Sequence, residues 1–261
     1  MISKSLIFLL KFLTALGLTI YLFSVGWLWP KNRRLLNAIC QHFGLFKFTP
    51  ASMTIKKTPL SALVPSTLTT VLAEPDIIQG NMSLYELAAI SRLTKKYSPR
   101  QIFEIGTFDG RTTLNLALNS DSEAKIFTID LPKNDTARAI LPVATTDQNL
   151  IKTNVTGARF TGQPESTKIT QLYGDTATFD FSPYIGEMDL IFVDGAHTYE
   201  YVMNDSVIAL KLLRDGRGLI IWHDYDQSHK GSIRALDELA AANPSWQICH
   251  IENTNLVCLI K

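Results

Sequence analysis

Four ionisable side chains that can bind a metal ion or move a proton follow two short apolar runs of this 261-residue chain. Asp194 and His197 come after the first run, and His223 and Asp224 come directly after the second. Because ligands of open parallel sheets bind beyond the carboxyl ends of the strands, we expect these side chains to converge. Carboxylates and imidazoles placed together can hold a divalent ion or supply a base.

The stretch Phe103–Thr113 is typical of a buried strand, a glycine turn and the first turn of a helix. Gly106 and Gly110 allow the backbone to turn tightly and to approach a ligand. A dinucleotide-binding turn needs a glycine where this chain has Phe108. A phosphate-binding P-loop needs Gly-Lys-Ser/Thr, but Arg111 follows the second glycine. Both interpretations are therefore disfavoured.

Glu104 lies two residues before the first glycine, where a carboxylate suits a cationic cofactor better than a phosphate. The run Glu-Ile-Gly-Thr-Phe-x-Gly-x-Thr-Thr-Leu resembles motif I of the class I S-adenosylmethionine-dependent methyltransferases, in the branch that includes small-molecule O-methyltransferases. The resemblance implies that Glu104, Gly106, Thr107 and Gly110 bind S-adenosylmethionine. The alternative is a glycine turn that serves packing only.

Two further acids fit the same cofactor. Asp130 ends the β-rich run 125–131, about 20 residues after the glycine turn, which is the spacing at which an acid meets a ribose in such folds. The alternative is a surface aspartate that caps the turn before Pro132. Asp175 follows the run 168–173, and the resemblance implies a contact with the adenine amino group.

The metal-dependent macrolide sugar O-methyltransferases and catechol O-methyltransferase carry an acid after the fourth strand and an acid-acid or acid-amide pair after the fifth. Asp194 and Asp224 match this pattern, whereas His223 replaces an oxygen ligand. Imidazole suits manganese, iron or zinc better than magnesium. The sequence therefore leaves open whether these three residues bind an ion, and which ion it would be. His197 matches the proposed general base of the macrolide enzymes, and an ordinary imidazole titrates at about 6.5. Either histidine alone is as easily explained by a structural role.

Alternating strand and helix patterns predict the elements that position these residues. We expect strands near 101–106, 125–131, 168–173, 188–193 and 218–223, and helices near 83–96, 111–119, 199–213 and 231–242. Runs 246–251 and 256–260 predict a terminal hairpin. The alternation predicts a doubly wound α/β fold, with a mostly parallel seven-stranded sheet that ends in a C-terminal antiparallel hairpin.

The chain divides into three predicted parts. Residues 81–261 form the methyltransferase domain, in which the irregular insertion 133–167 is expected to be a lid. Residues 35–80 form a membrane-proximal connecting segment. Its first part, 35–48, has helical spacing that suits either a membrane-surface helix or a packed core helix. Residues 1–34 form an N-terminal anchor with a basic flank.

Residues 12–29 carry no charge, and their apolar character extends back to Leu6. A helix of this length rises about 27 Å, close to the roughly 30 Å of a hydrocarbon core. A cleaved signal peptide is disfavoured, because the run is too long and lacks a small-x-small cleavage site. We therefore expect residues 6–29 to form a single-pass membrane helix. The basic residues 31, 33 and 34 after it favour a cytoplasmic catalytic domain.

Composition adds few constraints on partners. A formal net charge of +1 gives no electrostatic case for nucleic acid binding. Cys40, Cys249 and Cys258 have neither metal nor disulfide spacing, which suits a reducing compartment. The predicted substrate is a small molecule with a hydroxyl group, and the sequence specifies neither that molecule nor the oligomeric state. The alternatives are a non-catalytic methyltransferase-like membrane protein and a nicotinamide-dependent oxidoreductase, the latter disfavoured because no Tyr-x-x-x-Lys pair is present.

Overall fold

The computed structural model describes residues 4–43, 51–132, 139–144, 147–148 and 155–261. The chain forms two compact units, Met1–Pro50 and Ala51–Lys261. The second unit contains every candidate site residue identified above.

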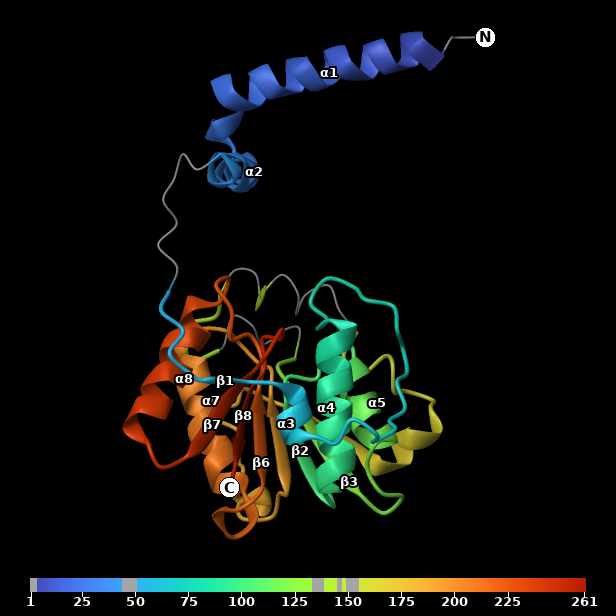
Figure 1. Ribbon diagram of the computed structural model, residues 1–261, viewed down its shortest axis with the longest axis vertical. Coiled ribbons are helices and arrows are strands. Elements are labelled where there is room, and N and C mark those ends of the chain that lie inside the picture. The colour runs from blue at the N-terminus through green and yellow to red at the C-terminus, as the bar shows by residue number, and fades with distance from the viewer. Residues whose placement is uncertain (1–3, 44–50, 133–138, 145–146, 149–154) are drawn as a thin grey trace. The chain divides into compact units, whose positions relative to one another are not determined.

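The second unit is built on one mixed sheet of eight strands among the described residues, in the order β1-β7-β8-β6-β5-β2-β3-β4 (Figure 1). The strands are β1 Lys57–Thr58, β2 Gln101–Ile105, β3 Lys125–Asp130, β4 Ile169–Tyr173, β5 Leu190–Val193, β6 Leu219–Trp222, β7 Gln247–Ile251 and β8 Val257–Ile260. Strand β8 pairs antiparallel with β6 and β7, and the other neighbours pair parallel.

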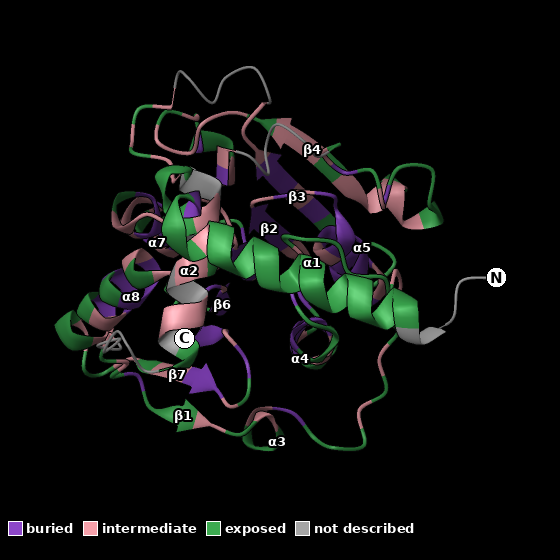
Figure 2. Cartoon of the chain, turned by 90° about the horizontal axis from the view of Figure 1, so that it is seen from above, coloured by how far each residue is buried: buried purple, intermediate pink, exposed green. Residues whose placement is uncertain are grey.

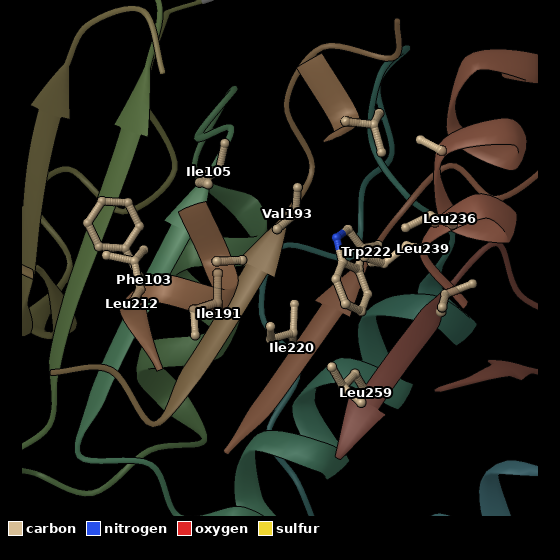
Figure 3. Packing of buried hydrophobic residues seen from close by; sticks show 14 of the residues in the cluster. Phe103, Ile105, Ile191, Val193, Leu212, Ile220, Trp222, Leu236, Leu239 and Leu259 are labelled. Carbon is tan, nitrogen blue, oxygen red and sulfur yellow. The ribbon is translucent and has the colours of Figure 1, made fainter. Parts of the chain in front are cut away.

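Helices cover both faces of this sheet (Figure 1). The α-helices are α3 Leu60–Leu63, α4 Leu84–Tyr97, α5 Arg111–Leu118, α7 Tyr199–Leu212 and α8 Lys230–Ala242, and the short 3-10 turns are η3 Pro164–Lys168, η4 Ser182–Tyr184 and η5 Arg214–Gly216. Successive strand residues point to opposite faces. Figure 3 shows Phe103, Ile191 and Trp222 on the face that packs against α7 and α8. Their neighbours Ile102 and Phe192 belong to the cluster that contains α4 and α5.

The predicted doubly wound fold and its seven strands are confirmed. The eighth strand is β1, a two-residue element that pairs with β7 and is too short to produce a period-2 pattern. It lies in the segment expected to be a connector, but residues 51–80 are part of the second unit. The side chains of Asn115 on α5 and of Asn119, just after it, hydrogen-bond the backbone of Ala73 and Val71 and hold this segment against the helix.

The first unit contains α1 Lys4–Ser24, the turn η1 Gly26–Leu28 and α2 Pro30–His42. Within the described residues, Leu6–Ser24 is the one helix long and apolar enough to cross a membrane, a property shared by signal sequences. Figure 2 shows this helix as exposed, in contrast to strands β2 and β3. Helix α2 begins at Pro30, earlier than expected, because proline is favoured in the first turn of a helix.

The loop after β2 is held by the described last part of the predicted lid, residues 155–167. Gly157 N donates to Phe108 O at 3.0 Å, and Arg159 N donates to Asp109 O at 2.8 Å. The Arg159 guanidinium also bonds the Asp109 carboxylate at 2.7 Å and Glu74 Oε2 at 3.0 Å. Residues 133–138, 145–146 and 149–154 of the predicted lid lie outside the described residues.

This contact predicts a large effect of Arg159 on stability. The Asp109 side chain is 5% exposed, so Arg159→Ala leaves a buried carboxylate without its cation. We expect a loss of about 3 kcal/mol in the free energy of unfolding, measured by denaturant titration of the full-length chain. The control is Arg234→Ala, which breaks the exposed pair with Glu238 and should have a much smaller effect. Equal losses in the two variants would contradict this interpretation.

Candidate functional site

A cavity of about 670 Å³ lies at the carboxyl ends of five neighbouring parallel strands. Its wall includes residues at the ends of β2, β3, β4, β5 and β6 or just after them, namely 105–106, 129–131, 174–176, 194–197 and 223–224. Helix α4 and the hairpin contribute Glu86 and Asn255. The cavity therefore occupies the place where an open parallel sheet binds its ligands.

Gly106 brings the end of β2 against the end of β5. Its φ is +97°, and a Cβ at this position would lie 2.0 Å from the Asp194 carbonyl oxygen. Gly110 also has a left-handed conformation, but a Cβ there would meet the Phe160 ring at 2.5 Å, so this glycine allows packing rather than access. Of the two, Gly106 alone is among the described residues that line the cavity.

Glu104 and Thr107 are buried beneath the turn, and neither is among the described lining residues. One carboxylate oxygen of Glu104 accepts hydrogen bonds from Thr113 and, at 2.6 Å, from Thr128. Thr107 Oγ1 lies 2.7 Å from Thr128 Oγ1. Burial raises the pKa of Glu104 to about 8. Direct contact of these two side chains with a cofactor stays a prediction. Their hydrogen bonds connect β2 with β3 and α5 beneath the turn.

Asp130 and Asp175 both line the cavity. The Asp130 carboxylate accepts hydrogen bonds from Phe108 N at 2.9 Å and Leu131 N at 2.8 Å, and burial raises its pKa to about 6. Each of its oxygens keeps a lone pair that can accept a ligand hydroxyl. Asp175 is more fully engaged, since it accepts from the Tyr201 hydroxyl and from two backbone N–H groups.

The two aspartates and two histidines after β5 and β6 converge, as expected from the order of the strands. His223 Nδ1 lies 3.1 Å from Asp194 Oδ1 and 3.2 Å from Asp224 Oδ2. His197 Nε2 lies 2.6 Å from the same Asp224 oxygen. Burial would lower the pKa of His223, but the Asp194 and Asp224 charges raise it well above its ordinary value. Buried carboxylates and imidazoles thus share one small volume.

Three residues extend this cluster beyond those identified from the sequence. Asp147 Oδ1 lies 2.8 Å from His197 Nδ1, on the side of the ring opposite Asp224. His229 stacks near His197, with ring centroids 4.4 Å apart. Glu86 Oε1 lies 3.6 Å from His223 Nε2, and this nitrogen has no hydrogen-bond partner among the described residues. His229 follows β6, as Asp224 does, so its place in the sequence could have indicated that it belongs to the cluster. Asp147 and Glu86 do not follow a strand of the cluster, and their sequence positions do not indicate this role.

The ionisation of His197 depends on both of its carboxylate neighbours. Burial by itself would lower the pKa of His197, but hydrogen bonds to Asp147 and Asp224 and the charges of both raise it to about 10. Burial would raise the pKa of Asp224, yet His223 and His197 hold it well below its ordinary range. Asp224 is therefore the anion that these imidazoles share.

The predicted metal ligands form a compact donor set. Asp194, His223 and Asp224 each offer a ligand atom, and these atoms lie within 4.8 Å of one another. Two carboxylates and one imidazole suit a divalent transition metal, so the residues fit such an ion. Glu86, facing the second nitrogen of His223, resembles the carboxylates that orient metal-binding imidazoles. His197, Asp224 and His229 form a second group whose ligand atoms lie within 4.8 Å of one another.

Residues 103–225 match the family described as a methyltransferase domain. The match covers less than half of the chain, and it agrees with the resemblance of the run Phe103–Thr113 to the class I S-adenosylmethionine-dependent methyltransferases. No curated protein matches the sequence.

Two solved structures share the fold at low identity. Cofactor-bound Rv0187 from MTB is 16% identical, with a TM-score of 0.53, and the similarity covers 71% of this chain and 84% of that one. The methyltransferase PaMTH1 from Podospora anserina, bound to SAH, is 17% identical, with a TM-score of 0.51 and coverage of 69% and 80%. These similarities confirm the arrangement of strands and helices around the cavity.

The raised pKa of Glu104 predicts a pH-dependent stability. The folded state binds this proton up to pH about 8, whereas the unfolded chain releases it near 4.5. The contribution to stability is therefore complete below pH 4.5 and is lost as the pH rises through 8. We expect Glu104→Gln to gain stability relative to the wild type as the pH rises from 5 to 9, by an amount on the order of 4 kcal/mol.

Denaturant titrations of both chains across this pH range measure the difference. Asp130 and Asp205 have raised pKa values because of burial, but they are present in both chains and largely cancel. Glu123→Gln at an exposed position controls for the loss of one acid. A pH-independent difference between Glu104→Gln and the wild type would show that this carboxyl is already ionised in the fold.

Proposed function

We propose that this protein transfers a methyl group from S-adenosylmethionine to a hydroxyl oxygen of a small molecule, assisted by a divalent cation. The observation that carries the proposal is the cluster of Asp194, His197, His223 and Asp224 at one end of the cavity. Strand order puts this cluster beside β5 and β6, while Asp130 ends β3 and Asp175 follows β4, on the other side of β2. One cavity thus has a half suited to the donor and a half suited to proton transfer.

The donor half is assigned from the residues on the β2, β3 and β4 side. Asp130 would accept hydrogen bonds from the ribose hydroxyls, and Gly106 would allow the methionine end to approach bare backbone. Asp175 would meet the adenine amino group. The proposal is supported by PaMTH1, whose structure contains SAH, the product left after S-adenosylmethionine gives up its methyl group. Glu104 and Thr107 would support the glycine turn from beneath. Gly110 would allow this turn to pack against Phe160.

Methyl transfer requires the acceptor oxygen to attack the sulfonium methyl in line while its proton is removed. Asp147 fixes the orientation of the His197 ring, so Nε2 is the nitrogen directed toward Asp224 and the cavity. With a pKa of about 10, His197 holds its own proton while Asp224 bonds it, so His197 would act as the base only after Asp224 Oδ2 leaves that nitrogen and the loss of this charge lowers the pKa. A divalent ion held by Asp194, His223 and Asp224 would supply a Lewis acid that lowers the pKa of the acceptor hydroxyl.

We place the enzyme at a membrane, with α1 as a single-pass anchor. The support is the length of the Leu6–Ser24 helix and the exposure of its apolar side chains. Basic residues 31, 33 and 34 follow the helix and favour a cytoplasmic catalytic unit, where S-adenosylmethionine is available.

Donor binding tests the first half of the proposal. Asp130→Asn should weaken S-adenosylmethionine binding by about 10- to 100-fold, since hydrogen bonds to a charged group contribute about 1.5–3 kcal/mol. Calorimetry of the full-length chain measures the affinity, with NAD as the competing cofactor and Asp121→Asn, at an exposed position, as the matched control. Binding of NAD without binding of S-adenosylmethionine would exclude the proposed donor.

Turnover tests the second half. His197→Ala and Asp194→Ala should reduce methyl transfer to the background rate while changing donor affinity less than about threefold, because neither side chain is assigned to the donor. A screen of membrane extracts with labelled donor would supply the acceptor. Chelation should also reduce turnover, and added Mn²⁺ should restore it in the wild type but not in Asp224→Ala. Full turnover by His197→Ala would remove the assigned base, and no product with wild type would favour a non-catalytic protein.

A further inference from the structure

Cys249 and Cys258 face each other across the C-terminal hairpin. They are directly opposed residues of the antiparallel strands β7 and β8, and their Sγ atoms lie 3.1 Å apart. Directly opposed residues of such strands have Cα atoms about 4.5–5.5 Å apart. This falls within the roughly 4.4–6.8 Å that a disulfide bridges, so side-chain rotation is enough to bring the sulfurs into bonding distance.

The two thiols differ in exposure and acidity. Cys249 is partly exposed, whereas Cys258 is fully buried. Hydrogen bonds from the Cys258 thiol and, more weakly, Thr58 lower the pKa of Cys249 to about 7, although burial opposes them. The hydrogen bond to Cys249 and burial raise the pKa of Cys258 well above its ordinary value. Cys249 is therefore the thiol that an oxidant reaches and the one that reacts first.

We propose that Cys249 and Cys258 form a reversible intramolecular disulfide, with a low-molecular-weight disulfide such as oxidised glutathione as the oxidant. The Cys249 thiolate attacks one sulfur of glutathione disulfide, forms a mixed disulfide and releases one glutathione thiolate. Cys258 then gives up its proton and attacks Cys249 Sγ, which breaks the mixed disulfide and releases the second glutathione. Two protein thiols are oxidised, and one glutathione disulfide is reduced to two thiols.

The bridge closes a loop that contributes to the wall of the cavity. Asn255 lies between the two cysteines in the chain and lines the cavity. Its N–H donates to Glu86 Oε1 at 2.7 Å, and its carbonyl accepts from Tyr225 N at 3.0 Å, one residue beyond Asp224. A disulfide between β7 and β8 therefore restrains the turn that contacts two neighbours of the acid–imidazole cluster.

The full-length Cys40→Ser chain tests the proposal, because it retains these two cysteines only. It is equilibrated with mixtures of oxidised and reduced glutathione, quenched with acid and alkylated in denaturant. Mass spectrometry then gives the number of alkylated cysteines and of bound glutathione molecules. We expect alkylation to fall from two sites to none without bound glutathione, and to return to two in excess reduced glutathione. The control, Cys40→Ser with Cys258→Ser, should instead retain one glutathione on Cys249.

Peptide mapping of the wild-type chain provides a second measurement that needs no substitution. A cross-linked peptide containing Cys249 and Cys258 is expected after oxidation. Two alkylated sites under oxidising mixtures, or stable glutathione on Cys249 while Cys258 is present, would overturn the proposal. Neither measurement requires donor binding or turnover, so its result is separate from that of the proposed methyl transfer.

Discussion

The close approach of Gly106 to the Asp194 carbonyl is the constraint on which the site depends. Gly106 begins the turn after β2 that borders the proposed donor half, and Asp194 begins the loop after β5 in the acid–imidazole half. A Cβ 2.0 Å from that carbonyl oxygen would push these two loops apart. Because β2 and β5 are hydrogen-bonded neighbours, the contact holds the two halves of the cavity in register.

The second constraint is electrostatic and centres on Asp224. This carboxylate is 8% exposed and lies within 3.4 Å of nitrogens from His197, His223 and His229. A buried carboxylate needs charged or hydrogen-bonding partners, and the imidazoles provide them. Asp147 and Glu86 face the outer nitrogens of His197 and His223, so the rings are oriented from both sides. The arrangement suits either a bound cation or a proton that moves among these groups.

Most of the sheet was predictable because its signals are local. The strands of 101–106, 125–131, 188–193 and 218–223 are short apolar runs, and helices with a recognisable period separate them. Strand β1 escaped detection because a two-residue strand has no period. Glu104 shows a different limit: the motif marks it as a cofactor residue, but the fold directs its carboxylate toward Thr113 and Thr128 beneath the turn. A motif specifies the residue type and leaves the direction of the side chain to packing.

The sequence by itself predicted the cofactor class, the order of strands that carry the candidate residues, and the convergence of Asp194, His197, His223 and Asp224. These follow from local periodicity and from the rule that parallel strands end at one edge of a sheet. Only the tertiary structure decided that Asp147, 50 residues before His197, orients its ring, and that Cys249 meets Cys258. Such contacts depend on loop paths and hairpin register, which no local pattern of residues encodes.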